Sequence, residues 1–146
     1  MEAYFAYGSN LNMKQMKSRC PDSLKLFSVV LPDHKLTFRR SVATIEPSQG
    51  EQVYGALYAV SKQDKENLDG YEGYPHLYDR KTYELNIWGT ERKTQAFGYY
   101  MNPEDHEESL PNIKYFDTIM DGYDDWGLPM DFLIIRLDKL RQKGVE

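Results

Sequence analysis

The sequence has little of the chemistry that marks a disulfide-bonded or metal-dependent protein. Its single cysteine, Cys20, excludes an internal disulfide bond and fits a reducing compartment. Cys20 precedes a proline and has no histidine nearby in sequence, a pattern that favours a small buried side chain over a nucleophile. The three histidines are widely separated, and no H-x-x-x-H or C-x-x-C pair is present. We therefore expect no bound metal.

Long apolar runs and basic clusters are also missing. No apolar stretch approaches the roughly 20 residues that span a bilayer, and no signal peptide is recognisable. The formal net charge is −5, and the one basic concentration, Lys35 with Arg39 and Arg40, is too small to indicate nucleic-acid binding. We therefore expect a cytoplasmic protein that binds neither membranes nor nucleic acid.

The chain is rich in tyrosine and has the length of one domain. It contains 146 residues without internal repeats or linkers, so we expect a single domain over 1–146. Twelve residues are tyrosines, which combine an apolar ring with a hydroxyl that needs a partner. Such a composition is typical of polar clefts with aromatic walls, although tyrosine also fills sheets.

Hydrophobic periodicity predicts a mixture of strands and helices, and thus an α+β domain. We expect strands at 24–31, 35–40, 43–45, 53–60, 80–88 and 93–101, the last two forming a hairpin. Residues 32–33 and 47–50 indicate a turn and a loop. A helix is expected at 61–69, where Ser61 and Asp64 have capping-box spacing. Two helical apolar stripes follow, made of Ile113, Phe116, Ile119, Met120 and Tyr123, and of Met130, Leu133, Ile134, Leu137 and Leu140.

A buried strand followed by a small polar turn opens the chain. Residues 3–7 are apolar or aromatic without alternation, which is typical of a strand buried on both faces. The turn Gly8-Ser9-Asn10 leads into an expected helix at 12–18, whose first backbone N–H groups can bind an anion. Ser9 or Asn10 is one candidate cap, and Asn12 with Gln15 is the other. The turn holds no Lys or Arg, so a carboxylate fits it better than a triphosphate.

Glu72 stands out among the carboxylates. It follows the helix expected at 61–69, in a segment rich in glycine and aromatic residues. Burial among such neighbours raises the pKa of a carboxyl group, and a carboxyl tuned toward neutrality can transfer protons. The same position also fits a solvated residue at the end of a helix, so the pattern alone leaves both roles open. The neighbours available to form an apolar wall are Tyr71, Tyr74, Leu77 and Tyr78.

Three segments resemble the γ-glutamylcyclotransferase family, which includes AIG2-like proteins and γ-glutamylamine cyclotransferases. They are Phe5–Leu11 (FAYGSNL), Leu68–Gly73 (LDGYEG) and Gly127–Pro129 (GLP), in order over nearly the whole chain. The YGSN turn is the most specific of them. The resemblance implies a compact α+β fold in which flanking helices surround a mixed, β-barrel-like sheet. It also implies a cavity where the turn meets the glutamate segment.

The resemblance also implies roles for individual residues. Glu72, the glutamate of LDGYEG, is the proton-transfer residue by this likeness. Tyr115, twelve residues before GLP, and Tyr78, the aromatic residue shortly after Glu72, would contact substrate. The 73–77 segment is slightly short for the family and contains Pro75, so the resemblance extends to the glutamyl side of the pocket and leaves the leaving-group side open. The turn would hold the γ-glutamyl group, which places Tyr4, Phe5, Ala6, Tyr7, Gly8, Ser9, Asn10 and Leu11 at the substrate.

The implied enzyme is of γ-glutamylcyclotransferase type, a transferase or lyase that needs no cofactor. The α-amine of a γ-glutamyl amide or peptide attacks its own γ-carbonyl, forms 5-oxoproline and releases an amine. Glu72 would act as general base and then acid, and the turn would hold the α-carboxylate or the carbonyl oxygen. Three alternatives remain open: a larger amine or biosynthetic intermediate as leaving group, a non-catalytic small-molecule binding module, and a structural protein. The expected partner is a small γ-glutamyl compound, bound by a monomer or a homodimer.

Overall fold

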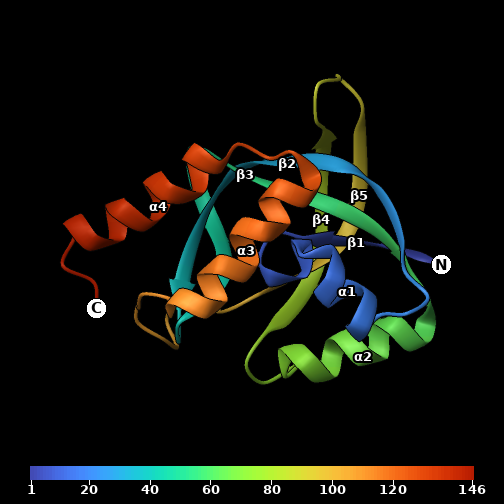
Figure 1. Ribbon diagram of the computed structural model, residues 1–146, viewed down its shortest axis with the longest axis horizontal. Coiled ribbons are helices and arrows are strands. Elements are labelled where there is room, and N and C mark those ends of the chain that lie inside the picture. The colour runs from blue at the N-terminus through green and yellow to red at the C-terminus, as the bar shows by residue number, and fades with distance from the viewer.

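Five strands close into a barrel in the computed structural model, which describes all residues from 1 to 146 (Figure 1). The barrel order is β1-β3-β2-β4-β5. All neighbouring strands are antiparallel except β1 and β5, which meet in parallel where Tyr4 pairs with Phe97. The α+β class and the barrel-like sheet are therefore confirmed. The strands are β1 (Glu2–Ala6), β2 (Leu24–Arg39), β3 (Val42–Val60), β4 (Asp79–Ile87) and β5 (Lys93–Tyr100).

Helices pack against the barrel, and side-chain caps set where three of them begin. The Asn12 side chain accepts a hydrogen bond from the Gln15 amide at 3.0 Å and caps α1, so the second of the two candidate caps is used. Ser9 and Asn10 lie instead in a 3-10 turn. The capping box predicted for Ser61 and Asp64 is confirmed at the start of α2. The helices are η1 (Ser9–Leu11), α1 (Met13–Arg19), α2 (Lys62–Glu72), α3 (Ile113–Trp126) and α4 (Met130–Gln142).

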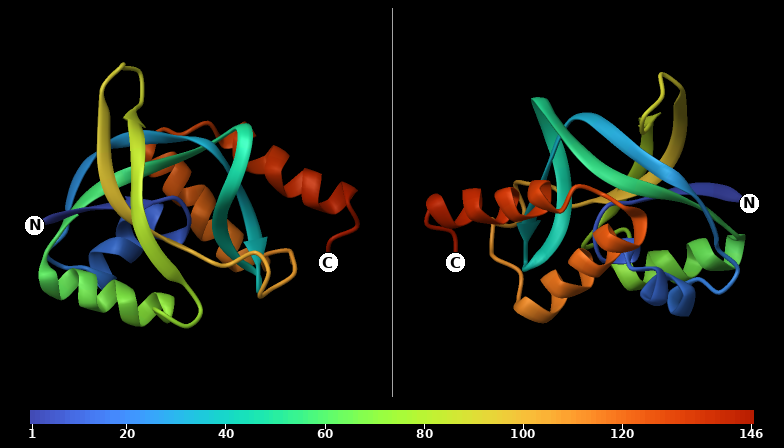
Figure 2. Two further views of the ribbon diagram at one scale, coloured as in Figure 1. Left: turned by 180° about the vertical axis from the view of Figure 1, so that it is seen from behind. Right: turned by 45° about the horizontal axis from the view of Figure 1, so that its top comes forward.

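The sequence predicted two interruptions of the sheet, and both predictions were wrong. The turn predicted at 32–33 and the loop predicted at 47–50 lie inside β2 and β3, which form one long curved hairpin (Figure 2). The ladder shifts register between Pro32 and His34, and Asp33 adopts a φ of 57° there. The Asp33 carboxylate accepts a hydrogen bond from the Gly50 amide at 3.0 Å. Turn-forming residues thus produce a bulge that bends paired strands, as barrel closure requires.

The apolar stripes of the last two helices pack on the barrel, with two exceptions. Phe116, Ile119 and Tyr123 are buried on α3, but Ile113 is 81% exposed because it begins the helix beyond the core. On α4, Ile134 is exposed and the guanidinium of Arg136 is buried instead, where it donates to the Leu36 carbonyl at 2.8 Å. Cys20 is fully buried, as expected of a filler. No helix of the chain has both the length and the hydropathy needed to cross a bilayer.

The turn after β1 is held in place by α3. The Trp126 indole donates to the Leu11 carbonyl at 3.0 Å, and the side-chain NH2 group of Asn12 donates to the Thr118 carbonyl at 3.2 Å. Gly122 allows this close approach, because a Cβ there would lie 2.6 Å from both the Asn12 nitrogen and the Leu11 Cβ. A segment from the last quarter of the chain therefore positions the YGSN turn.

Candidate active site

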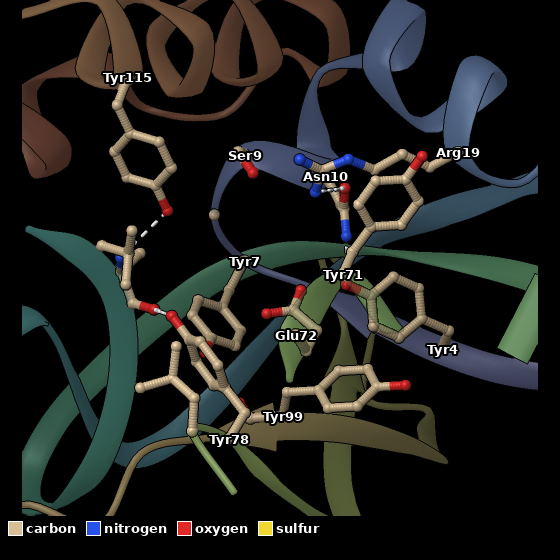
Figure 3. Close-up of a pocket in the computed structure, with 14 residues that line it drawn as sticks. Tyr4, Tyr7, Ser9, Asn10, Arg19, Tyr71, Glu72, Tyr78, Tyr99 and Tyr115 are labelled. Atoms are coloured by element: carbon tan, nitrogen blue, oxygen red, sulfur yellow. Dashed lines mark hydrogen bonds between the residues drawn. The ribbon is translucent and has the colours of Figure 1, made fainter. Parts of the chain in front are cut away.

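A cavity of about 150 Å³ opens where the turn after β1 meets the end of α2 (Figure 3). A cavity of that volume can hold a molecule of roughly benzene size, which suits one end of a small metabolite. Its walls come from β1, the turn, α1, the start of β3, the end of α2 with the loop after it, β5 and α3. The lining residues are Tyr4, Tyr7, Gly8, Ser9, Asn10, Arg19, Val42, Ala43, Tyr71, Glu72, Leu77, Tyr78, Tyr99 and Tyr115.

Glu72 is the only carboxylate in this cavity and lies near its centre (Figure 3). It is the last residue of α2, and Gly73 ends the helix in the left-handed conformation, with a φ of 63°. The side chain keeps some contact with solvent through the mouth, but protein atoms surround the carboxyl group. Burial raises the pKa of Glu72 to about 7, and the nearby Arg19 guanidinium partly offsets this effect. Glu72 can therefore both accept and release a proton near neutral pH.

Because the pKa of Glu72 is higher in the folded chain than in the unfolded chain, its ionisation costs stability. This cost is absent below pH 4.5, grows as pH rises, and is complete above about pH 7. We expect Glu72→Gln to remove it, and thus to stabilise the protein by about 1–3 kcal/mol more at pH 8 than at pH 4.5. Urea unfolding at both pH values measures the difference. Glu66→Gln, at an exposed site on α2, is the control, and equal changes in both variants would contradict the assignment.

Asn10 organises the turn opposite Glu72. Its buried side chain donates to the Tyr4 hydroxyl at 2.9 Å and accepts from Gln15 and Arg19, each at 3.2 Å. Its carbonyl accepts from the Tyr58 hydroxyl at 3.0 Å. The first hydrogen bond of the turn runs from the Leu11 amide to the Gly8 carbonyl, so the turn does not use the N–H groups of residues 8–10. These amides are available to an oxyanion or a carboxylate.

Two tyrosine hydroxyls bind the backbone of the same residue of β3, one at its carbonyl and one at its N–H. Tyr78 donates to the Ala43 carbonyl at 2.5 Å, and the Ala43 amide donates to the Tyr115 oxygen at 3.0 Å. Tyr78 therefore keeps lone pairs with which to accept, whereas Tyr115 keeps its proton to donate. Burial raises the pKa of Tyr115 to about 12 and that of Tyr78 well above its usual value, so both remain protonated at neutral pH.

A polar cluster beneath the cavity holds the last turn of α2 to the barrel. Asp69 pairs with Arg80 of β4 at 2.5 Å and accepts from the Tyr99 hydroxyl of β5 at 2.7 Å. The Arg80 guanidinium lies 4.1 Å from the centroid of the Tyr74 ring. Asp69 is the aspartate of the LDGYEG segment, three residues before Glu72. Its contacts fix the helix end from which Glu72 enters the cavity.

The structure brings most of the expected site residues together. Eight of them line the cavity: Tyr4, Tyr7, Gly8, Ser9, Asn10, Glu72, Tyr78 and Tyr115. Phe5, Ala6 and Leu11 do not, because their side chains are buried in the core. Phe5 packs against Gly55 and Gly98, and a Cβ at either position would contact its ring. These three residues shape the segment without reaching a ligand.

The aromatic wall expected around Glu72 is only partly present. Tyr71 and Leu77 line the cavity with Tyr78, but Tyr74 stacks on Arg80 outside it. Four lining residues were not anticipated from the sequence: Arg19, Val42, Ala43 and Tyr99. For Arg19 a signal existed, since it follows Gln15 by four residues and shares a helix face with it. The others are brought in by strand pairing. No three His, Cys, Asp or Glu side chains are grouped closely enough to hold a metal ion.

Comparisons of sequence and of structure with known proteins find similarity to proteins with related names. The human protein called gamma-glutamylcyclotransferase is 29% identical over 141 residues, which cover 88% of this chain and 73% of the human protein. A zebrafish (Danio rerio) protein called gamma-glutamylaminecyclotransferase A is 32% identical over 77 residues, or 51% of this chain and 48% of that one. A solved structure titled gamma-glutamyl cyclotransferase superposes with a TM-score of 0.83 at 27% identity, covering 99% of this chain and 88% of that structure.

The family match extends over most of the chain and includes the cavity described above. Residues 4–118 match the model for the family described as gamma-glutamyl cyclotransferase, AIG2-like. That range contains the YGSN turn, the LDGYEG segment and every residue that lines the cavity. The resemblance is therefore confirmed over a continuous stretch that contains two of its three segments, while GLP lies beyond that stretch. This chain belongs to the γ-glutamyl cyclotransferase, AIG2-like family.

Proposed function

We propose that this protein converts a γ-glutamyl amide or peptide into 5-oxoproline and a free amine. The observation that carries the proposal is the position of Glu72, whose carboxyl group lies in a small cavity opposite the unused amides of the YGSN turn. A proton acceptor facing a set of fixed donors is the arrangement that intramolecular acyl transfer needs. The family membership supports the same reaction.

The reaction combines ring closure with the transfer of two protons from the α-ammonium to the leaving nitrogen. The substrate arrives with its α-amine protonated, and the Glu72 carboxylate removes one proton from it. The freed nitrogen attacks the γ-carbonyl carbon and closes a five-membered ring. The carbon–nitrogen bond to the leaving group then breaks as Glu72 returns this proton to the departing nitrogen. The Glu72 carboxylate takes the second proton from the ring nitrogen and passes it to the released amine, which leaves as an ammonium ion. Because the nucleophile belongs to the substrate, holding the chain in a folded-back conformation supplies much of the rate.

The remaining cavity groups bind and orient the γ-glutamyl part. The amides of residues 8–10 are donors for either the α-carboxylate or the carbonyl oxygen as it gains negative charge. The Tyr115 hydroxyl has a proton to donate, and the Tyr78 hydroxyl has lone pairs that can accept from the α-ammonium. The tyrosine rings restrict access of water. Together these groups favour ring closure over hydrolysis.

The proposal fixes the pH dependence of the reaction. The proton acceptor is the Glu72 carboxylate, and the pKa of Glu72 is raised to about 7. We therefore expect kcat/KM to increase tenfold per pH unit below about pH 7 and to level off above it. The measurement is the initial rate of 5-oxoproline formation at low substrate concentration, from pH 5 to 8. A rate that stays constant down to pH 5 would exclude Glu72 as the base.

The test of the proposed function is product formation from a panel of γ-glutamyl compounds. The panel contains γ-glutamyl-alanine, glutathione, γ-glutamyl-ε-lysine and γ-glutamyl-ethylamide. The proposal predicts 5-oxoproline from at least one of them, and the preferred compound identifies the leaving group. If none reacts but 5-oxoproline binds, the chain is a binding module for the same ligand class. If nothing reacts or binds, the proposal is wrong for all these leaving groups.

A further inference from the structure

Arg19 is the only cationic side chain that lines the cavity, and no carboxylate lies within ion-pair distance of it. The chain has six ion pairs, none of which includes Arg19. Its one side-chain hydrogen bond goes to the Asn10 amide oxygen at 3.2 Å. A guanidinium has five N–H donors, so four remain for a ligand. The mechanism proposed above gives this group no task.

The surroundings of Arg19 place it at the mouth of the cavity. Its guanidinium lies 4.4 Å from the centroid of the Tyr71 ring, and Tyr71 is 58% exposed. By contrast, Tyr4, Tyr7 and Tyr78 in the inner wall are at most 6% exposed. In Figure 3 the Arg19 side chain extends over Asn10 on one side of Glu72, and Tyr115 and Tyr78 lie on the other side. Arg19 thus stands between solvent and the proton-transfer group.

The γ-glutamyl part and the leaving group of the substrate require different binding groups in the cavity. The γ-glutamyl part is small and constant, and the turn amides and tyrosine hydroxyls are available to it in the interior. The leaving group is variable and must extend toward solvent, past Arg19. When the leaving amine is an amino acid, its carboxylate lies two bonds from the nitrogen that Glu72 must protonate. A fixed guanidinium beside Glu72 fits that carboxylate.

We propose that Arg19 binds the carboxylate of the leaving amino acid and so selects γ-glutamyl-amino acids over γ-glutamylamines. The assignment rests on the proposed function, since it concerns the leaving group of that reaction. Tyr71 fixes the plane of the guanidinium by stacking, and Asn10 fixes its position by accepting one hydrogen bond. Arg19 is thereby a specificity residue and has no part in bond breaking.

The kinetic test compares two substrates that differ by one carboxylate, γ-glutamyl-alanine and γ-glutamyl-ethylamide. The readout is the ratio of their kcat/KM values, because a general loss of structure lowers both and leaves the ratio unchanged. Loss of a charged hydrogen bond typically costs about 10- to 100-fold. We therefore expect the ratio to fall by about that factor in Arg19→Met, mainly through KM for the peptide, and to recover partly in Arg19→Lys. An unchanged ratio would overturn the assignment.

The matched control is Lys17→Met, which removes an exposed positive charge from the same helix without touching the cavity. It should keep the wild-type ratio. If the ratio falls in Lys17→Met as well, the preference for the carboxylate substrate comes from long-range electrostatic attraction, and the assignment to Arg19 is wrong. Equal losses for both substrates in Arg19→Met would mean that Arg19 binds the glutamyl α-carboxylate or only supports the turn, which also contradicts it.

Calorimetric titration with the same two compounds separates failure of this inference from failure of the proposed function. Tighter binding of γ-glutamyl-alanine that is lost in Arg19→Met, without turnover of either compound, would support the carboxylate site and reject the reaction. Turnover with no Arg19-dependent preference in binding or rate would support the reaction and reject the carboxylate site.

Discussion

Glu72→Gln is expected to lower 5-oxoproline formation by about 10²- to 10⁴-fold, the range typical of losing a general acid–base group. Glutamine keeps the size and much of the hydrogen-bonding capacity of glutamate but cannot remove the proton from the substrate ammonium. The cavity walls do not depend on the charge, because no ion pair or side-chain hydrogen bond anchors the Glu72 carboxylate. Binding of 5-oxoproline should therefore persist.

The comparison is made with wild type and with Glu66→Gln, which changes an exposed glutamate on the same helix. Initial rates and calorimetric titration of 5-oxoproline are measured on all three proteins. Glu66→Gln should behave as wild type. Retained turnover in Glu72→Gln would show that another group transfers the proton. Loss of folding in this variant would show that Glu72 is structural, in conflict with the destabilising effect expected of its buried charge.

Gly122→Ala is expected to cause a large loss of stability through a single added methyl group. The new Cβ would lie 2.6 Å from the Asn12 nitrogen and 2.7 Å from the Leu11 carbonyl carbon, both backbone atoms that cannot move aside. Overpacking of this kind costs about 1–3 kcal/mol or more, which exceeds the roughly 1 kcal/mol that alanine gains over glycine in a helix. Because the displaced segment is the turn that carries Asn10, activity should fall as well.

Gly70→Ala provides the matched control, since Gly70 also lies inside a helix but has no atom within 4 Å of an added Cβ. It should be neutral or stabilising by up to about 1 kcal/mol. If α3 packs on the turn as described, urea unfolding should show a lower free energy of unfolding for Gly122→Ala and an unchanged or higher one for Gly70→Ala. Equal stabilisation of both proteins would mean that α3 does not contact the turn closely.

Local sequence patterns predicted those helices and strands whose alternation, caps and turn residues agree with the tertiary structure. The hairpin β4–β5 has regular alternation and a glycine-containing turn, and α2 has its capping box at Ser61 and Asp64. The β2–β3 hairpin was predicted in fragments because Asp33 and Gly50 carry turn signals that the fold uses for a bulge. No local pattern distinguishes a residue that ends a strand from one that bends it, since the partner strand decides.

In the candidate site, too, local segments could be predicted, but contributions that depend on tertiary structure could not. Glu72 and the turn could be predicted because each lies in a continuous segment with an unusual composition. Phe5 was assigned to the site through its place in the motif, but strand geometry directs its ring into the barrel core, where Gly55 and Gly98 make room. Ala43 was missed because its contribution is a backbone amide and carbonyl, which the residue type does not reveal.

The most direct test of the account is the identity of the acidic product formed from γ-glutamyl-alanine. Proton NMR of the reaction with wild-type protein follows alanine, 5-oxoproline and glutamate in one sample. Intramolecular attack by the α-amine predicts alanine and 5-oxoproline in equal amounts, with no reaction when the α-amine is acetylated. Glutamate in place of 5-oxoproline would mean that water is the nucleophile, and would contradict the function assigned to Glu72 and the YGSN turn.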